Sequence, residues 1–201
     1  SCSMGMAVKL NGEVGWLTAA HCGEIGDVFH TVSCDTLTMG ALRKKADNEE
    51  ETNAIVDVGF IKKDVSSNVA PVKTIIGGGE WTDDNYHGML GYAPVGGQVS
   101  VHSWKLPPNY RSSGKVTSID SVIKYKDKKN YYVSSVNCYS LQGASGGPVV
   151  ISGIINGKKY AYITGFVSGS NDNLAYPNTT FTDVATAVKY LGGNCFGYSI
   201  D

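Results

Sequence analysis

The segment Gln142-Gly143-Ala144-Ser145-Gly146-Gly147-Pro148 places one serine among three glycines, and the apolar run Val149-Val150-Ile151 follows directly. Glycine tolerates backbone angles that other residues avoid, so the pattern predicts a tight loop that enters a buried strand. Such a loop can hold a serine hydroxyl clear of its own backbone and aim N–H groups at one point beside it. A serine is a weak nucleophile without a base and an orienting acid. If Ser145 reacts, the chain must also supply a histidine and an aspartate in unusual settings.

The histidine in the most unusual setting is His21. It follows Leu17-Thr18-Ala19-Ala20, where a buried strand breaks into a loop at Cys22-Gly23. The other histidines have no comparable setting, and we expect ordinary surface or capped residues at His30, His87 and His102.

Asp57 is a single aspartate inside the apolar strand predicted for residues 54–61. Buried carboxylates are rare unless a partner pairs with them. A histidine can take a serine proton when a carboxylate holds its other ring nitrogen. His21, Asp57 and Ser145 could therefore carry out acyl transfer, with the N–H groups of Gly143 and Ser145 binding the oxyanion. These residues come from three separate segments, so the site is expected at the seam of two half-domains.

The fold predicted from the chain is all-β. Two Asn-Gly pairs, Asn11-Gly12 and Asn156-Gly157, are strong hairpin signals between apolar runs. Further strands are expected near residues 28–32, 37–42, 97–105, 114–125 and 130–138. One helix is expected at 183–191, where apolar residues recur at helical spacing before Gly192-Gly193. Glycine-rich residues 71–97 predict the crossing between two mainly antiparallel halves, which we divide into residues 1–85 and 86–201.

The charged stretch from Arg43 to Thr52 contains three glutamates and three basic residues. Its composition favours a solvated loop, with a calcium site as a minor alternative. No metal or other cofactor is expected for the chain.

The five cysteines include no Cys-x-x-Cys pair, which argues against a zinc or thioredoxin-type site. If Asn11 and Gly12 form a two-residue turn, Cys2 lies opposite His21, and a single bulge brings it within reach of Cys22. A Cys2–Cys22 disulfide is therefore plausible, with two buried free thiols as the alternative. Three pairings remain open among Cys34, Cys138 and Cys195, and Cys138–Cys195 is favoured because both are expected in the second half.

Composition narrows the possible partners. The net charge is 17 − 18 = −1, so nothing indicates a nucleic-acid or anionic-membrane partner. No apolar run approaches the ~20 residues of a membrane span. No signal segment opens the chain, and we expect that any such segment has been removed.

Three motifs resemble those of the chymotrypsin-like serine proteases. Thr18-Ala19-Ala20-His21-Cys22 resembles their histidine motif, Asp57-Val58-Gly59 their aspartate motif, and Gly143-Ala144-Ser145-Gly146-Gly147-Pro148 their nucleophile motif. The order of the three is the family's, and the pattern spans residues 2–191.

The resemblance implies two six-stranded antiparallel β-barrels with the active site between them, and a C-terminal helix. It also implies a secreted, monomeric serine endopeptidase that acts on peptides or proteins, and a disulfide at Cys2 and Cys22. The short chain is most similar in style to the streptogrisin and alpha-lytic type. Two other functions remain open: a protease-fold binding or adhesion module without proteolysis, and an esterase that uses the same triad.

Two departures from the family concern activation. Ala144 stands where the family usually has an aspartate, and the chain lacks an Ile-Val-Gly-Gly start. Both halves of the trypsin-style activation switch are thus missing together. A removed pro-segment is the expected maturation route.

Substrate preference is expected to be apolar or aromatic at P1. Tyr139 occupies the position six before Ser145, where trypsin-like members carry an aspartate, and no acidic residue lies between it and Ala144. Val167-Ser168-Gly169-Ser170 resembles the strand that binds the substrate backbone, with Ser168 supporting the catalytic aspartate. Val167 replaces the histidine of glutamate-specific members. The residues implied in substrate binding are Tyr139, Gln142, Val167, Ser168, Gly169 and Ser170.

Overall fold

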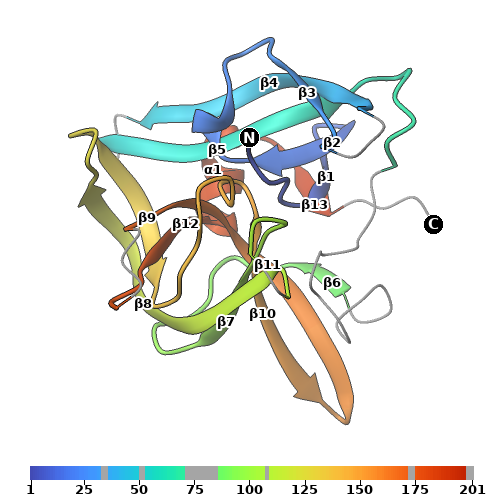
Figure 1. Cartoon of the computed structure of the whole chain (residues 1–201). Helices are drawn as coiled ribbons and strands as arrows, with labels where there is room; N and C mark the ends of the chain where they lie inside the picture. The colour runs from blue at the N-terminus through green and yellow to red at the C-terminus, as the bar shows by residue number, and fades with distance from the viewer. Residues whose placement is uncertain (33–35, 50–52, 71–85, 107–108, 172–174, 198–201) are drawn as a thin grey trace.

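The computed structural model describes residues 1–32, 36–49, 53–70, 86–106, 109–171 and 175–197. The chain forms two groups of strands that lie one above the other in Figure 1, with one helix behind them. None of the helices in these ranges has the length and apolar character needed to cross a bilayer.

The first group has six strands in the order β3-β4-β5-β2-β1-β13. Five come from the start of the chain, and β13 returns from its end to pair antiparallel with β1. The C-terminal end therefore completes the N-terminal group. The bounds are β1 Ala7–Leu10, β2 Glu13–Thr18, β3 Val28–His30, β4 Thr38–Glu49, β5 Ala54–Lys63 and β13 Cys195–Gly197.

The second group is a closed barrel. Its strands run in the order β12-β11-β10-β7-β8-β9, and an antiparallel pairing of β12 with β9 closes the ring. A short strand, β6 (Tyr86–Met89), adds parallel to β11. The bounds are β7 Gln98–His102, β8 Arg111–Lys124, β9 Asn130–Val136, β10 Pro148–Ile155, β11 Lys158–Ser170 and β12 Thr179–Asp183. The expected fold class is confirmed as a double β-barrel with a C-terminal helix.

Both Asn-Gly pairs form the expected two-residue turns. Leu10 pairs with Glu13 across Asn11 (φ 50°) and Gly12 (φ 85°). The second turn has the same form, with φ 52° at Asn156 and 76° at Gly157. Positive φ at both central residues is the type I′ geometry, which matches the twist of the flanking strands.

One apolar cluster spans both groups of strands. It contains Phe60 of β5, Phe166 of β11 and Leu191 of helix α1 (Val184–Leu191), all at most 1% exposed. Burying one such aromatic side chain stabilises the fold by ~2–3 kcal/mol. The seam between the groups is therefore packed core, which fixes the residues on either side of it.

The charged stretch after Arg43 differs from its prediction as a loop. Strand β4 continues to Glu49, with Lys45 paired to Gly59 and Ala46 to Val58 of β5. Pairing with a buried strand satisfies the backbone while the side chains of Arg43 and Lys44 stay exposed, so local polarity does not end the strand. Residues 50–52, and residues 71–85 of the expected crossing, lie outside the described ranges.

Of the two disulfides favoured from the sequence, one is correct and one is wrong. The Cys2–Cys22 disulfide is present, with Cα atoms 6.0 Å apart. The favoured Cys138–Cys195 pairing is wrong, because both are buried free thiols in different core clusters. Cys195 lies on β13, which belongs to the first group, whereas Cys138 lies in the second. Cys34 falls outside the described residues.

Candidate active site

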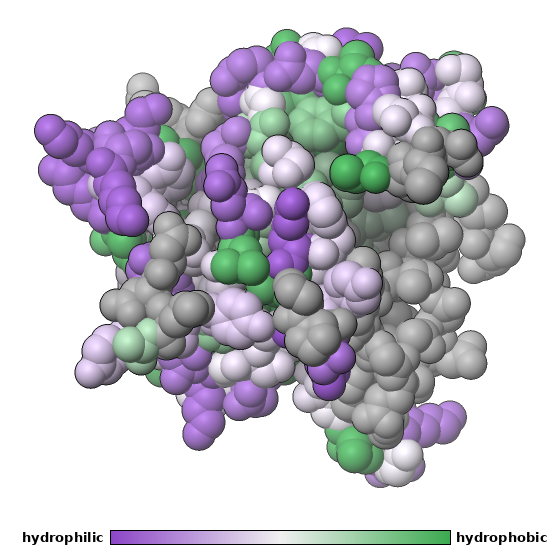
Figure 2. Space-filling model, viewed as in Figure 1, coloured by the Kyte–Doolittle hydropathy of each residue, from purple (hydrophilic) through white to green (hydrophobic). Residues whose placement is uncertain are grey.

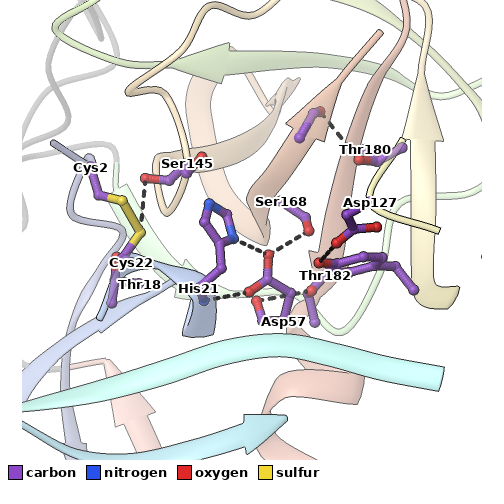
Figure 3. A network of polar contacts seen from close by, with 12 residues as sticks. Cys2, Thr18, His21, Cys22, Asp57, Asp127, Ser145, Ser168, Thr180 and Thr182 are labelled. Carbon is purple, nitrogen blue, oxygen red and sulfur yellow. Dashed lines mark hydrogen bonds and ion pairs between the residues drawn. A yellow bond between two sulfur atoms is a disulfide. The ribbon is translucent and has the colours of Figure 1, made fainter. Parts of the chain in front are cut away.

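His21 and Asp57 come from neighbouring strands of the first group. Strand β2 ends at Thr18, which pairs with Gly59 of β5, and the chain then turns through the short 3-10 helix η1 (Ala20–Cys22). Asp57 lies two residues before Gly59 on β5 and is fully buried. The turn therefore brings His21 back over Asp57, as Figure 3 shows.

Two hydrogen bonds join these residues. The imidazole Nδ1 lies 2.7 Å from Asp57 Oδ2, and the His21 backbone N–H donates to Oδ1 at 3.0 Å. With the carboxylate accepting from Nδ1–H, the Nε2 lone pair faces away from Asp57. The His21 side chain is 42% exposed and that of Asp57 is 1% exposed. The pair therefore presents a fixed, accessible imidazole above a buried carboxylate.

The second group of strands supports Asp57 from the other side of the seam. Ser168 Oγ donates to Asp57 Oδ2 at 2.5 Å, and Thr182 Oγ1 donates to the Asp57 carbonyl oxygen at 3.3 Å. The β11–β12 register shifts between Val167 and Gly169, and Ser168 lies in this irregularity. A bulge of this kind redirects one side chain, which here meets the carboxylate.

The pKa of His21 is raised above its ordinary value of 6.5. The hydrogen bond that His21 donates to Asp57 is the largest cause and raises the pKa; burial, which lowers it, is next, and the negative charge of Asp57, which raises it, follows. Lys45 opposes the rise weakly. The imidazolium is therefore more stable beside Asp57 than in water.

The loop around Ser145 is held by its backbone. Gly146 N–H donates to Val167 C=O at 2.7 Å, and Ser145 C=O accepts from Ser3 N–H at 2.8 Å. Gly146 has φ +84°, and a Cβ there would lie 2.3 Å from the Ser3 carbonyl oxygen and from Thr18 Oγ1. Only glycine fits this position.

Two N–H groups of the loop are left open. Among the described residues, neither the N–H of Gly143 nor that of Ser145 has a hydrogen-bond partner. The backbone of Gly143 has a φ of +95°, and the loop turns at this residue. No hydrogen bond joins Ser145 Oγ to His21 in the described structure, and such bonds are often long before a substrate binds.

The comparison with solved structures finds the same arrangement of strands. Cellulomonas bogoriensis chymotrypsin matches with a TM-score of 0.65 and 22% identity over 99% of this chain and 91% of that chain. Thermobifida fusca protease A matches at 0.64 and 20% over 98% and 90%, and the alpha-lytic protease homolog N4 at 0.67 and 14% over 94% and 88%. The chain has the chymotrypsin-like serine protease fold. No protein-family model matches it, and neither does any curated protein.

In this chymotrypsin-like fold, a cavity of about 570 Å³ lies beside His21. Three of the expected substrate-binding residues, Ser168, Gly169 and Ser170, line it. The opposite wall comes from the hairpin of β8 and β9, including Tyr125 and Tyr131. The sequence predicts the two strands of this hairpin but not its position at the site, because its place beside β11 depends on closure of the barrel.

The other expected substrate-binding residues lie elsewhere. Val167 is 1% exposed in the core of the second barrel, and its N–H and C=O bond to Gly147 and Gly146 of the serine loop. Tyr139 packs partly against the same core, and Gln142 is exposed. Of these three, Val167 shapes the serine loop rather than the cavity.

Ala144 fits its surroundings in this fold. Its side chain is fully buried in the apolar core cluster of the second barrel. A carboxylate there would need a charged partner. An uncharged residue at 144 therefore lets the loop form without one.

Among the described residues, one group of side chains has the spacing of metal ligands: Cys2, His21 and Cys22, with ligand atoms within 4.8 Å of one another. The two sulfurs are bonded to each other, so neither is the thiolate that binds metals. The site thus offers an imidazole, a carboxylate and a serine.

Proposed function

We propose that this chain is a serine endopeptidase that cleaves peptide bonds through an acyl-enzyme. Ser145 is the nucleophile, His21 the general base and Asp57 the residue that orients the base. The observation that carries the proposal is the His21–Asp57 pair, with a 2.7 Å bond and an exposed imidazole, beside a serine loop with two open N–H groups.

The mechanism follows from these positions. Ser145 Oγ attacks the scissile carbonyl carbon while His21 Nε2 takes its proton. The bonded carboxylate of Asp57 stabilises the resulting imidazolium. The N–H groups of Gly143 and Ser145 bind the oxyanion that forms, and its collapse expels the amine with the proton from His21. A water molecule then repeats the sequence on the acyl-enzyme and releases Ser145.

An open strand edge supports a peptide as the substrate. The pairing of β11 with β10 reaches only to Phe166 opposite Pro148, while residues 169 and 170 pair with β12 on the other side. Among the described strands, none pairs with the other edge at residues 168 and 169. An extended peptide can add to such an edge by main-chain hydrogen bonds, which would carry its carbonyl group toward Ser145.

The preference for an apolar or aromatic P1 residue remains part of the proposal. The segment from Tyr139 to Ala144 contains no acidic side chain, and Ser140 C=O accepts a hydrogen bond from Ser170 Oγ at 3.1 Å. A segment without acidic side chains offers no charged partner for a Lys or Arg at P1. The Cys2–Cys22 disulfide supports secretion, since such bonds persist in oxidising compartments. Maturation from a pro-segment and action as a monomer complete the proposal.

Digestion of a proteome-derived peptide library, with products read by mass spectrometry, tests the proposal. The wild type should cleave after Phe, Tyr, Leu or Met, while Ser145→Ala and His21→Ala should not cleave. Cleavage of activated esters without any peptide cleavage would indicate an esterase. A folded wild type that cleaves neither would indicate a binding module, and preferred cleavage after Arg or Glu would overturn the P1 assignment.

A further inference from the structure

The cavity beside His21 has walls of different chemistry. One wall is the β11 edge with Ser168, Gly169 and Ser170, which carries hydroxyl and backbone groups. The other is the β8–β9 hairpin, which contributes two lysines, Lys124 and Lys126. A volume of about 570 Å³ is enough for one or two side chains of a bound peptide.

Positive charge is concentrated at this hairpin. Residues 124–129 hold four lysines and one aspartate, 4 − 1 = +3, in a chain whose net charge is −1. Figure 2 shows the end of this hairpin as a projecting hydrophilic lobe, on the side where Figure 1 places the β8–β9 turn. The turn is ordered by a hydrogen bond from Lys128 N–H to Tyr125 C=O at 2.9 Å, so the lysines stand on a defined scaffold.

The two acidic residues that the structure describes near the cavity, Asp127 and Asp57, already accept hydrogen bonds. Asp127 is the one acidic residue among its described lining residues, and its carboxylate accepts from Lys129 N–H and from Tyr131 Oη, each at 2.9 Å. Asp57 is buried beneath His21. Their hydrogen bonds offset part of the repulsion that these two carboxylates would exert on an incoming acidic side chain.

Tyr125, in the hairpin wall of the cavity, is neutral. A Cβ on Gly169 would lie 2.9 Å from the ring of Tyr125, so this glycine is what allows the tyrosine to pack against β11. Burial, and next the charge of Asp57, raises the pKa of Tyr125, which keeps the phenol protonated. This tyrosine therefore adds no charge that would repel an acidic ligand.

We propose that this cavity binds acidic side chains of the substrate at the positions P2 to P4, N-terminal to the scissile bond, with Lys124 and Lys126 as the specificity-determining residues. The proposal rests on the proposed endopeptidase activity and names the substrate class for that same site. A peptide that adds to residues 168–170 runs between the two walls, so its side chains meet the hairpin lysines while its carbonyl group reaches Ser145.

The lysines are exposed, so their effect is moderate and depends on salt. The Debye length is ~30 Å at 0.01 M salt and ~3 Å at 1 M. We expect an acidic residue at P2–P4 to raise kcat/KM by ~3–10-fold over its amide counterpart at low salt, and by less than ~2-fold at 1 M.

The test uses quenched fluorescent peptides that share one P1 residue and one primed side. Asp, Asn, Glu, Gln or Lys is placed at P2, P3 and P4 in turn, and kcat/KM is measured at low and high salt. The enzyme forms are the wild type, Lys124→Gln, Lys126→Gln, and the charge-reversed pair Lys124→Glu with Lys126→Glu. Lys115→Gln is the matched control, because Lys115 is an exposed lysine of the same strand β8 that does not line the cavity.

The expected result is a preference for Asp and Glu in the wild type and in Lys115→Gln, reduced in each single variant. Charge reversal should turn it into a preference for Lys peptides. Equal rates for acidic and amide peptides in an active wild type, or an acidic preference that survives charge reversal, would overturn the inference. If no peptide is cleaved, affinity of Ser145→Ala for the same peptides, measured by fluorescence anisotropy, separates the two proposals. Acidic preference in binding would keep this inference while the endopeptidase proposal fails, and equal binding would end both.

Discussion

The acid–base pair on the first barrel and the serine loop on the second are prepared to different degrees. Both oxygens of the Asp57 carboxylate accept hydrogen bonds, from His21 and Ser168. The serine loop instead leaves the N–H groups of Gly143 and Ser145 without partners among the described residues. In the proposed mechanism, the base is therefore held before a substrate binds, whereas the two oxyanion donors gain a hydrogen-bond partner only when a substrate binds. Preorganised donors of this kind act where charge develops in the transition state.

The largest expected effect comes from removing either reacting group. Ser145→Ala and His21→Ala should each lower kcat/KM for a peptide substrate by ~10⁴–10⁶-fold, because each removes the same attack step. The double variant should lose little more than either single variant. Steady-state kinetics on all three, with circular dichroism as the control for folding, would measure this. Additive losses would show that the two residues do not act as a unit.

Removing the charge of the acid should cost about 10⁴-fold in kcat. Asp57→Asn keeps the size of the side chain but can no longer hold His21 with Nδ1 protonated and Nε2 free. Single-turnover kinetics would measure the loss. Retained activity would mean that the 2.7 Å contact between His21 and Asp57 has no part in the reaction.

The pH profile sharpens the same comparison. Asp57 raises the pKa of His21 above 6.5, so the midpoint of the acidic limb of the kcat/KM profile should lie above pH 6.5. Only the neutral imidazole accepts the serine proton, so activity should be lost as the pH falls through this pKa. In Asp57→Asn the limb should move to lower pH, because the main cause of the rise is removed. A limb at the same pH in both enzymes would contradict this assignment.

A smaller loss of activity is expected when the hydrogen bond between Ser168 and Asp57, which joins the two barrels, is removed. Ser168→Ala removes a donor to the buried Asp57 carboxylate, and hydrogen bonds to charged groups contribute ~1.5–3 kcal/mol. We expect kcat to fall by about 10-fold and KM to change little. Thr179→Ala, which removes a buried hydrogen bond to the Cys138 carbonyl oxygen but none to Asp57, is the matched control. Equal losses in both variants would assign the effect to the second barrel as a whole.

The smallest effect on chemistry is expected at the disulfide. Replacing Cys2 and Cys22 by serine should lower the free energy of unfolding by ~2–4 kcal/mol. The folded variant should keep most of its kcat, because neither sulfur bonds to the imidazole. Urea unfolding gives the stability and kinetics below the transition gives the rate. A folded variant without activity would show that the disulfide positions His21.

The sequence was most informative where the local chemistry determines the conformation. The Asn-Gly pairs required positive φ, and their turns appear as expected at Asn11 and Asn156. The apolar setting of Asp57 indicated a buried, partnered carboxylate, and its bonds to His21 and Ser168 agree.

Features that depend on pairing between strands far apart in the sequence could not be predicted from local residues. Strand β4 continues through charged residues because β5 pairs with its backbone. Cys195 lies far from Cys138 because β13 returns to β1. The lysine wall of the cavity exists only because the closed barrel brings the β8–β9 hairpin opposite residues 168–170.

Labelling with a fluorophosphonate probe tests the central claim, that His21 and Asp57 activate Ser145, most directly. Intact mass should show one adduct on the wild type and none on Ser145→Ala or His21→Ala. The absence of an adduct on folded wild type, or an adduct that persists in Ser145→Ala, would contradict the account.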